Sequence, residues 1–219
     1  MNDERSKAEQ DLRVIRSLME RATVYRAISA PAALVAGLLS IFAAAAIYLN
    51  HASSFSSGRP VGAREFAVIW LIVLAIAVLA NAFFIWREAK KDSRPFISSG
   101  MKLALRAIVP NLLIPVAFTV WFYADGYKRG TEYYLAVLWI AFYGLALLST
   151  GLFAPRSLVF LGWAFLLSAL TLSALGNVSK DPGLPNLAMG ITFGLYHLVY
   201  AVCTWPRRRG DEIEQFAVE

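Results

Sequence analysis

The amino-acid sequence predicts an all-α fold, a polytopic integral membrane helical bundle with six transmembrane helices, preceded by an amphipathic N-terminal cytoplasmic helix. The composition is the first reason, because 58% of the 219 residues are apolar, only 16% are charged and the mean hydropathy is +0.55. The second is the presence of six long apolar runs without Asp, Glu or Lys. Each run is long enough to cross a hydrocarbon core of roughly 30 Å.

The third reason is an unequal distribution of basic residues. When the six runs are laid across a bilayer in alternation, sixteen of the twenty-one Lys and Arg residues fall on one side and five on the other. Basic residues are retained on the cytoplasmic side, so the sequence predicts a cell-membrane protein with a cytoplasmic N-terminus and C-terminus. The five on the external side are Arg59, Arg64, Lys128, Arg129 and Lys180.

The predicted domains are a cytoplasmic amphipathic helix at 1–27, a transmembrane domain at 28–206 and a cytoplasmic tail at 207–219. In the first of these, Leu12, Ile15 and Leu18 recur at helical spacing, whereas Arg13 and Arg16 occupy the other side. Such a helix can lie on the cytoplasmic leaflet or pack against the loops of the bundle. The sequence leaves both arrangements open.

The first span is expected to begin at Ser29-Ala30-Pro31, because serine caps helices and proline is tolerated in the first turn. It runs to about Asn50, and the polar residues 51–58 are expected to form an external loop. Aromatic residues near the predicted boundaries, such as Trp70 outside and Trp205 inside, suit the membrane interface. The other spans are expected at 66–86, 103–124, 133–153, 157–177 and 187–205.

Small residues at helical spacing predict how the spans pack. Lipid tails compete with large apolar side chains, so close approach of helices depends on small residues and polar contacts. The first span carries them at every fourth position and the last span carries two glycines, which we interpret as contacts within one bundle rather than as a dimer motif. These residues are Ala32, Ala36, Ser40 and Ala44, with Gly190 and Gly194.

Polar residues inside the predicted spans are few. Asn81, Asn111 and His197 lie at similar depths in the second, third and sixth spans. A polar side chain in hydrocarbon needs a hydrogen-bond partner, so we expect Asn81 and Asn111 to share a polar cluster that His197 joins, together with Tyr200 or Tyr196. The cluster is either an interhelical clamp or a site for a ligand or a proton.

Two prolines in the third span add to the polarity of this region. Pro110 and Pro115 have no amide hydrogen, so the carbonyls of Arg106 and Asn111 lose their helical donors. We expect a kink there. Carbonyls freed in this way can bind water, a cation or a substrate hydroxyl.

Several chemistries find no support in the sequence, and no cofactor, metal site or catalytic residue is predicted. The two histidines, His51 and His197, lie at different depths, which argues against a haem held between two helices. The single cysteine, Cys203, cannot supply a thiolate metal cage. Acidic residues at Asp125-Gly126 and Asp181-Pro182-Gly183 are typical of turns rather than of a catalytic pair, so an enzyme is not expected.

The charge pattern indicates partners at the cytoplasmic face. The net charge of +6 lies beside membrane segments, so anionic lipid head groups are expected there and nucleic acid is not. The leading functional hypothesis is an accessory or regulatory membrane subunit that contacts lipid or a membrane-protein partner through this face. The candidate contact residues are Arg13, Arg16, Arg21, Arg26, Arg87, Lys90, Lys91, Arg94 and Lys102.

The alternative hypothesis is a small-solute transporter or channel that uses the polar cluster. No repeat relates the first three spans to the last three, so the inverted-repeat signature of many transporters is not seen in the sequence. The spans also lack an intramembrane carboxylate or lysine for ion coupling.

Overall fold

The computed structural model is helical throughout the membrane domain that it describes, and six helical segments are long and apolar enough to cross a membrane. The prediction of a helical bundle with six helices that could cross a membrane is confirmed for the described residues. The described residues are 7, 9–15, 30–57, 62–91, 99–126, 128, 130–152, 154–175, 181 and 183–205. The spans are α2 (Ala30–Ser57), α3 (Ala63–Lys91), α4 (Ser99–Ala124), α5 (Thr131–Ser149), α6 (Arg156–Leu175) and a composite of α7 (Leu184–Met189), η1 (Gly190–Tyr196) and α8 (His197–Thr204).

Several helices extend beyond the limits that hydropathy predicts. The prediction of a loop at 51–57 is wrong, because α2 continues to Ser57 through a stretch without Gly or Pro. The helix α3 begins three residues earlier and ends five residues later than expected. Glu65 in its first turn and Lys91 in its last turn are favourable for the helix dipole. Hydropathy therefore marks the membrane-embedded part of each helix rather than its ends.

The N-terminal segment is described only in part. Residues 9–15 are helical and all their side chains are exposed, including Leu12, Arg13 and Ile15. The predicted domain boundaries at 27/28 and 206/207 lie outside the described residues.

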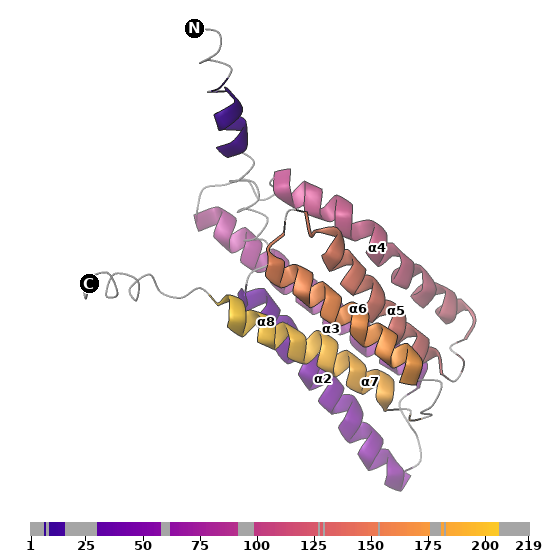
Figure 1. Cartoon of the computed structure of the whole chain (residues 1–219). Helices are drawn as coiled ribbons and strands as arrows, with labels where there is room; N and C mark the ends of the chain where they lie inside the picture. The colour runs from indigo at the N-terminus through magenta and orange to yellow at the C-terminus, as the bar shows by residue number, and fades with distance from the viewer. Residues whose placement is uncertain are drawn as a thin grey trace.

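The spans pack as two groups (Figure 1). In the first group, α2 packs against α3 and against the composite last span. In the second group, α5 packs against α4 and α6. The two groups meet where α5 contacts α3 and α7, and where α6 contacts α7 and η1. Although α3 and α4 follow one another in the sequence, they make few contacts with each other.

Glycines allow the closest approaches between helices. A Cβ atom on Gly190 would lie 2.8 Å from Ala44 Cβ, and one on Gly194 would lie 2.7 Å from Ile41 Cγ1. The prediction that these glycines contact another helix of the same bundle is confirmed. A second close contact was not predicted, because a Cβ on Gly144 of α5 would lie 2.9 Å from the carbonyl oxygen of Gly162 on α6.

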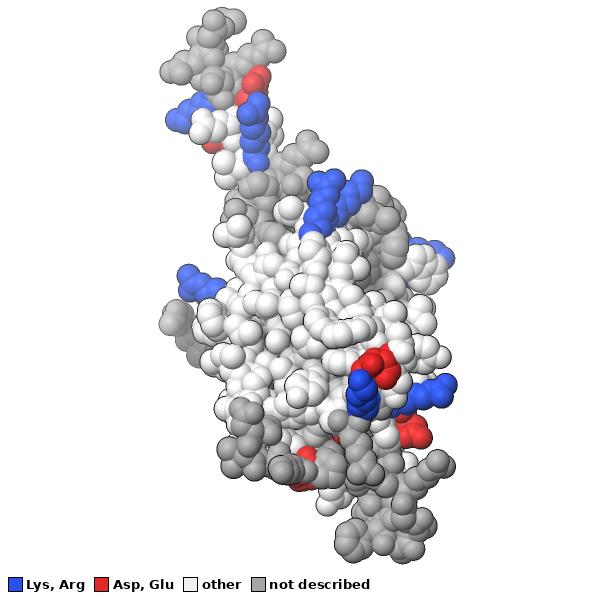
Figure 2. All heavy atoms as spheres, turned by 90° about the vertical axis from the view of Figure 1, so that its right-hand side faces the viewer, with Lys and Arg blue, Asp and Glu red and all other residues white. Residues whose placement is uncertain are grey.

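Charged residues lie at the two ends of the bundle, on either side of a broad uncharged band (Figure 2). Between residues 30 and 205, the described residues at one end, here called the basic end, comprise six basic residues and one acidic residue. The other end, the acidic end, has two basic and four acidic residues. The basic end contains Arg87, Glu88, Lys90, Lys91, Lys102, Arg106 and Arg156, and the acidic end contains Arg64, Glu65, Asp125, Lys128, Glu132 and Asp181.

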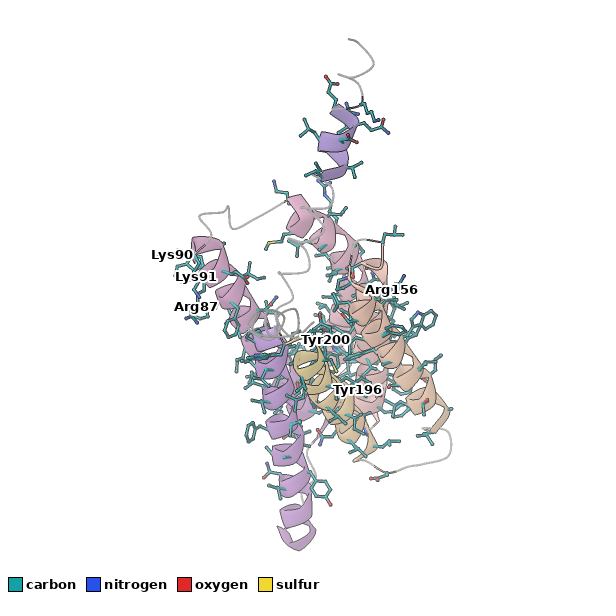
Figure 3. All side chains as sticks on the ribbon, turned by 60° about the vertical axis from the view of Figure 1, so that its left-hand side comes forward. Arg87, Lys90, Lys91, Arg156, Tyr196 and Tyr200 are labelled. Atoms are coloured by element: carbon teal, nitrogen blue, oxygen red, sulfur yellow. The ribbon has the colours of Figure 1, made fainter. Side chains whose placement is uncertain are left out.

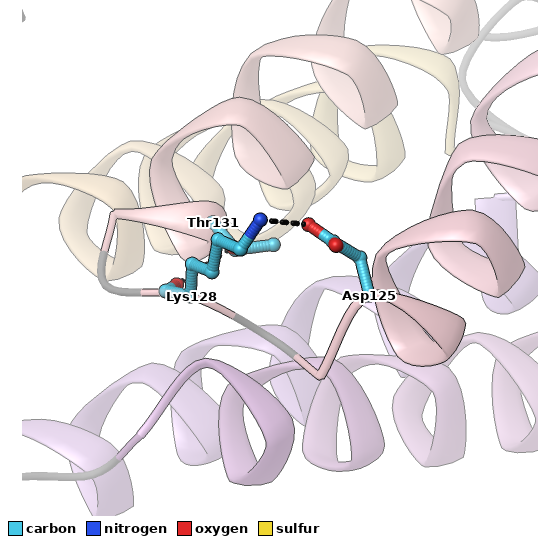
Figure 4. A network of polar contacts seen from close by, with 3 residues as sticks. All are labelled: Asp125, Lys128 and Thr131. Atoms are coloured by element: carbon cyan, nitrogen blue, oxygen red, sulfur yellow. Dashed lines mark hydrogen bonds and ion pairs between the residues drawn. The ribbon is translucent and has the colours of Figure 1, made fainter.

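The predicted turn at Asp125-Gly126 is confirmed and connects α4 to α5 (Figure 4). Gly126 and Gly130 have φ angles of 81° and 86°, a left-handed conformation that favours glycine. Lys128 Nζ lies 2.8 Å from Asp125 Oδ2, and Thr131 Oγ1 donates to the carbonyl of Lys128 at 2.7 Å. The Asp125–Lys128 pair is exposed and therefore contributes little to stability.

Candidate functional site

A cavity of about 290 Å³, partly open to the outside, lies among the helices, and all six spans contribute to its wall. The wall is mostly apolar, and the described residues that form it include no Asp, Glu, Lys or Arg. Protein interiors rarely leave voids much larger than a water molecule, so a space of this size among six helices is a candidate binding site. Its aromatic residues are Phe66, Trp70, Trp139, Tyr143, Phe193 and Tyr200.

Three of the four residues of the predicted polar cluster line this cavity. Asn81 reaches it from α3, and His197 and Tyr200 reach it from α8, on which Figure 3 labels Tyr200. Asn111 is not part of the cavity wall. Its Nδ2 donates to the carbonyl of Ala107 at 3.0 Å, one turn earlier in α4, so its amide is used within its own helix.

Two carbonyls near the α4 prolines accept side-chain hydrogen bonds, but they are not the carbonyls of Arg106 and Asn111 that the prolines deprive of a helical donor. Ser149 Oγ of α5 also donates to the carbonyl of Ala107, at 3.0 Å, and Thr119 Oγ1 donates to that of Pro115 at 2.7 Å. The helix α4 remains continuous from Ser99 to Ala124 with both prolines inside it. Tyr196, the alternative to Tyr200 in the predicted cluster, instead shares a 2.9 Å hydrogen bond with Ser168 on α6.

His197 is held by a partner from another helix. Its Nε2 lies 2.8 Å from the hydroxyl oxygen of Tyr143, which belongs to α5. The imidazole ring is stacked on Phe193 at a centroid distance of 6.2 Å, and Phe165 packs against its edge at 5.7 Å. With a proton on Nδ1, the imidazole Nε2 accepts the hydrogen bond from Tyr143.

A seven-residue π-helix, η1, precedes His197. In a π-helix the hydrogen bonds run from residue i to i+5, and such segments occur frequently at functional sites. Here η1 carries Phe193 to the cavity wall, and α8 continues from it with His197 and Tyr200 on the same wall. Hydropathy contains no signal for this change of helix type, so the sequence analysis did not anticipate it.

Two polar atoms of residues in the cavity wall are buried without a hydrogen-bond partner among the described residues. They are Trp70 Nε1 and Asn81 Oδ1. Trp70 is only 7% exposed. A buried polar atom without a partner costs about 1–3 kcal/mol, so these two atoms lower the stability of this part of the bundle.

Trp70 was interpreted from the sequence as an interfacial aromatic residue, and that interpretation is wrong. Its ring is buried and contacts Phe66 and Phe193, with centroid distances of 6.2 and 6.5 Å. A tryptophan near the end of an apolar run is compatible with either location, because its ring is amphipathic. Only the packing of α3 against its neighbours distinguishes them.

The predicted contact residues of the cytoplasmic face lie apart from the cavity. Arg87, Lys90 and Lys91 project from the end of α3, as Figure 3 shows, and Lys102 is exposed on α4. Lys90 Nζ lies 5.4 Å from the ring centroid of Trp86. Arg13 is exposed in the N-terminal helical segment. Arg16, Arg21, Arg26 and Arg94 lie outside the described residues.

Within the described ranges, no three His, Cys, Asp or Glu side chains are grouped so that they could hold a metal ion. Comparisons of the chain with protein-family models, with curated proteins and with solved structures gave no match.

Proposed function

We propose that this multi-pass membrane protein binds a small, mainly apolar molecule inside its bundle, and that it belongs to the transporter class rather than to the enzymes. The observation that carries the proposal is the cavity of about 290 Å³ that all six spans line. An engineered cavity of about 150 Å³ with apolar walls binds benzene, so this one has room for about two such rings.

Two further observations favour a ligand over a purely structural clamp. A clamp requires polar groups that satisfy one another, whereas Trp70 Nε1 and Asn81 Oδ1, on two residues of the wall, are buried without a partner among the described residues. Two polar pairs close across helices in the wall, Tyr143 with His197 and Trp139 with Thr119, and the rest of the wall is mostly apolar and surrounds a volume that a clamp does not need. The wall therefore combines an apolar volume with a few oriented polar atoms, which is typical of small-molecule sites.

Retention of naphthalene by the protein in lipid nanodiscs tests this proposal. Ala77 lines the cavity from α3, whereas Ala75 on the same helix is exposed and does not line it. We expect Ala77→Phe to fill the cavity and weaken naphthalene binding about tenfold or more, by loss of the bound volume. Ala75→Phe adds the same ring on the lipid side and should bind naphthalene like the unmodified protein.

Equilibrium dialysis against protein-free nanodiscs measures the retention that is due to protein. Thermal unfolding of both variants in the same nanodiscs checks that the bundle is intact. If the unmodified protein retains no more naphthalene than the Ala77→Phe variant, the proposal is wrong.

We also propose that the basic end faces the cytoplasm, where it contacts anionic lipid head groups. The support is the ratio of six basic residues to one acidic residue at this end, against two and four at the other. A second role, as an accessory or regulatory subunit, rests on the same exposed residues. Co-purification of a stoichiometric membrane protein that is lost on Arg87→Glu and Lys91→Glu substitution would favour that role.

Cysteine labelling of intact cells tests the orientation. In a Cys203→Ser background, a membrane-impermeant maleimide should label an Asp181→Cys variant and leave a Lys91→Cys variant unlabelled until the cells are opened. Both positions are exposed, one at each end of the bundle. Labelling of only the Lys91→Cys variant in intact cells would reverse the proposed orientation.

A further inference from the structure

We propose that the cavity opens sideways into the bilayer between α3 and α4, and that an acyl chain of an anionic phospholipid enters it through this opening. The inference rests on the proposed function, because it names the ligand class and the entry route of the same cavity.

The position of the opening follows from how α3 and α4 meet. Both helices line the cavity, α3 from Phe66 to Asn81 and α4 from Ile108 to Thr119. They nevertheless make few contacts with each other, and α5 lies against both of them. Two helices that share a cavity wall without packing together leave the wall open between them.

The exposure of the wall residues locates the edge of this opening on α3. Val78 lines the cavity and is 57% exposed, and Leu71, seven residues earlier, lines it and is 39% exposed. Across the cavity, Leu135 and Leu147 of α5 are only 1% and 5% exposed. Leu71 and Val78 therefore face both the cavity and the outside of the bundle, and they form the rim of the opening.

The rim lies at the depth of the hydrocarbon core. The charged residues nearest to Val78 on α3 are Arg87 and Glu65, at about 14 and 20 Å along the helix axis. Beside the rim, Leu79 on α3 is 69% exposed, and Leu113 on α4 is 59% exposed. The surroundings of the opening are thus apolar, so a molecule that enters here comes from the lipid rather than from water.

The shape of the cavity suits a flexible chain. Its wall extends along α3 from Phe66 to Asn81, about 22 Å, and along α5 from Leu135 to Leu147, about 18 Å. A volume of about 290 Å³ that extends so far along the helices is narrow. It is about twice the volume of a cavity that binds benzene, so it holds on the order of twelve carbon atoms of a chain.

An acyl chain enters such a space at little cost. The chain loses no hydration, because the lipid that it leaves is as apolar as the wall. Its carbon atoms supply the dispersion contacts that the residues around an empty space lack. The described wall residues include no charged side chain, so the head group of the lipid stays outside.

The head group is expected at the basic end. Arg87 and Lys91 project from the end of α3, and Lys102 is exposed near the start of α4, so both helices that border the opening carry positive charge there (Figure 3). Val78 lies about 14 Å from Arg87 along α3, which is about half of the hydrocarbon core. A lipid with its phosphate at this end therefore reaches the rim with its acyl chain.

Photo-crosslinking in phosphatidylcholine nanodiscs tests the inference, with a small fraction of phosphatidylglycerol that carries a diazirine at the end of one acyl chain. From Leu135 to Leu148 no residue of α5 is exposed, so lipid around the bundle does not reach this stretch from outside. We expect mass spectrometry to find adducts on α5 at 143–147. Adducts at Phe160, which is 72% exposed on α6, serve as the positive control.

A variant of the rim tests the route of entry. Val78→Trp should close the opening and lower the yield of α5 adducts about fivefold or more, because the larger ring occupies the space that the chain crosses. Leu79→Trp is the matched control, since Leu79 is exposed and does not line the cavity. It should leave the α5 adducts at the level of the unmodified protein. Adducts at Phe160 should be equal in all three proteins.

The outcomes separate this inference from the proposed function. Adducts at Phe160 without adducts on α5 in the unmodified protein would overturn the inference, while naphthalene retention that Ala77→Phe weakens would leave the proposed function standing. Equal α5 adducts in Val78→Trp and Leu79→Trp would overturn the route. Absence of both α5 adducts and Ala77-dependent retention would overturn both proposals. Should Val78→Trp fail to fold, Ala77→Phe should remove the same adducts and Ala75→Phe should keep them.

Discussion

Replacing Phe165 with alanine should lower the free energy of unfolding by about 2–3 kcal/mol, because it opens a hole at the centre of the bundle. The Phe165 side chain is fully buried on α6. Its ring contacts Tyr143 at a centroid distance of 4.8 Å and Phe193 at 5.1 Å, and it lies against His197. In a soluble protein the loss would be larger, but here the unfolded reference state keeps phenylalanine in lipid, so mainly packing is lost.

The chain provides a matched control on the same helix. Phe160 of α6 is 72% exposed, and in a bilayer it contacts lipid in both the folded and unfolded states. Phe160→Ala should therefore change the free energy of unfolding by less than about 0.5 kcal/mol. Circular dichroism during titration from mild detergent into a denaturing detergent measures both variants. Equal destabilisation by the two substitutions would contradict the central position of Phe165.

Gly144→Leu should destabilise the bundle by about 3 kcal/mol, the upper part of the range for overpacking. A Cβ atom at Gly144 would lie 2.9 Å from the carbonyl oxygen of Gly162 and 3.0 Å from Leu166 N and Phe165 Cβ. These atoms belong to the backbone or its first side-chain carbon, so none can move without displacing α6. The same measurement on Ala174→Leu, an exposed position on α6, serves as the control and should show little change. An unaltered unfolding curve for Gly144→Leu would show that α5 and α6 are not in close contact.

The six spans were predictable because hydropathy measures directly what crossing a bilayer requires. The limits of the helices were less predictable. The polar residues 51–57 are helical in the structure, since a helix requires compatible backbone geometry but not apolar side chains. A helix of 29 residues such as α3 is about 43 Å long and must extend beyond a core of roughly 30 Å.

The candidate site was only partly predictable. Asn81 and His197 were found because a polar residue in a span is conspicuous, and both line the cavity. Asn111 was equally conspicuous but bonds within α4, an option that every helical Asn has and that the sequence cannot exclude. Trp70 was assigned to the interface, because the sequence shows its position along the span but not whether its side chain faces lipid or the other helices.

The close contact between α5 and α6 escaped the sequence analysis for a related reason. Gly144 and Gly162 face each other from two helices, so neither helix shows the repeated small residues that mark such a contact within a single span. By contrast, Gly190 and Gly194 lie on one helix at the expected spacing and were recognised.

The π-helix η1 also has a consequence for how the last span tolerates insertion and deletion. A π-helical turn holds one residue more than an α-helical turn. The helices α7 and α8 on either side of η1 therefore present the same faces to the bundle as they would in a continuous α-helix one residue shorter. Deleting a single residue from 190–196 would let the segment relax into regular α-helix without shifting α8 relative to α7. A deletion one turn outside this segment would instead rotate everything beyond it by about 100°. Among the described segments, η1 is therefore the one from which a single residue can be removed while the two ends of the span keep their orientation.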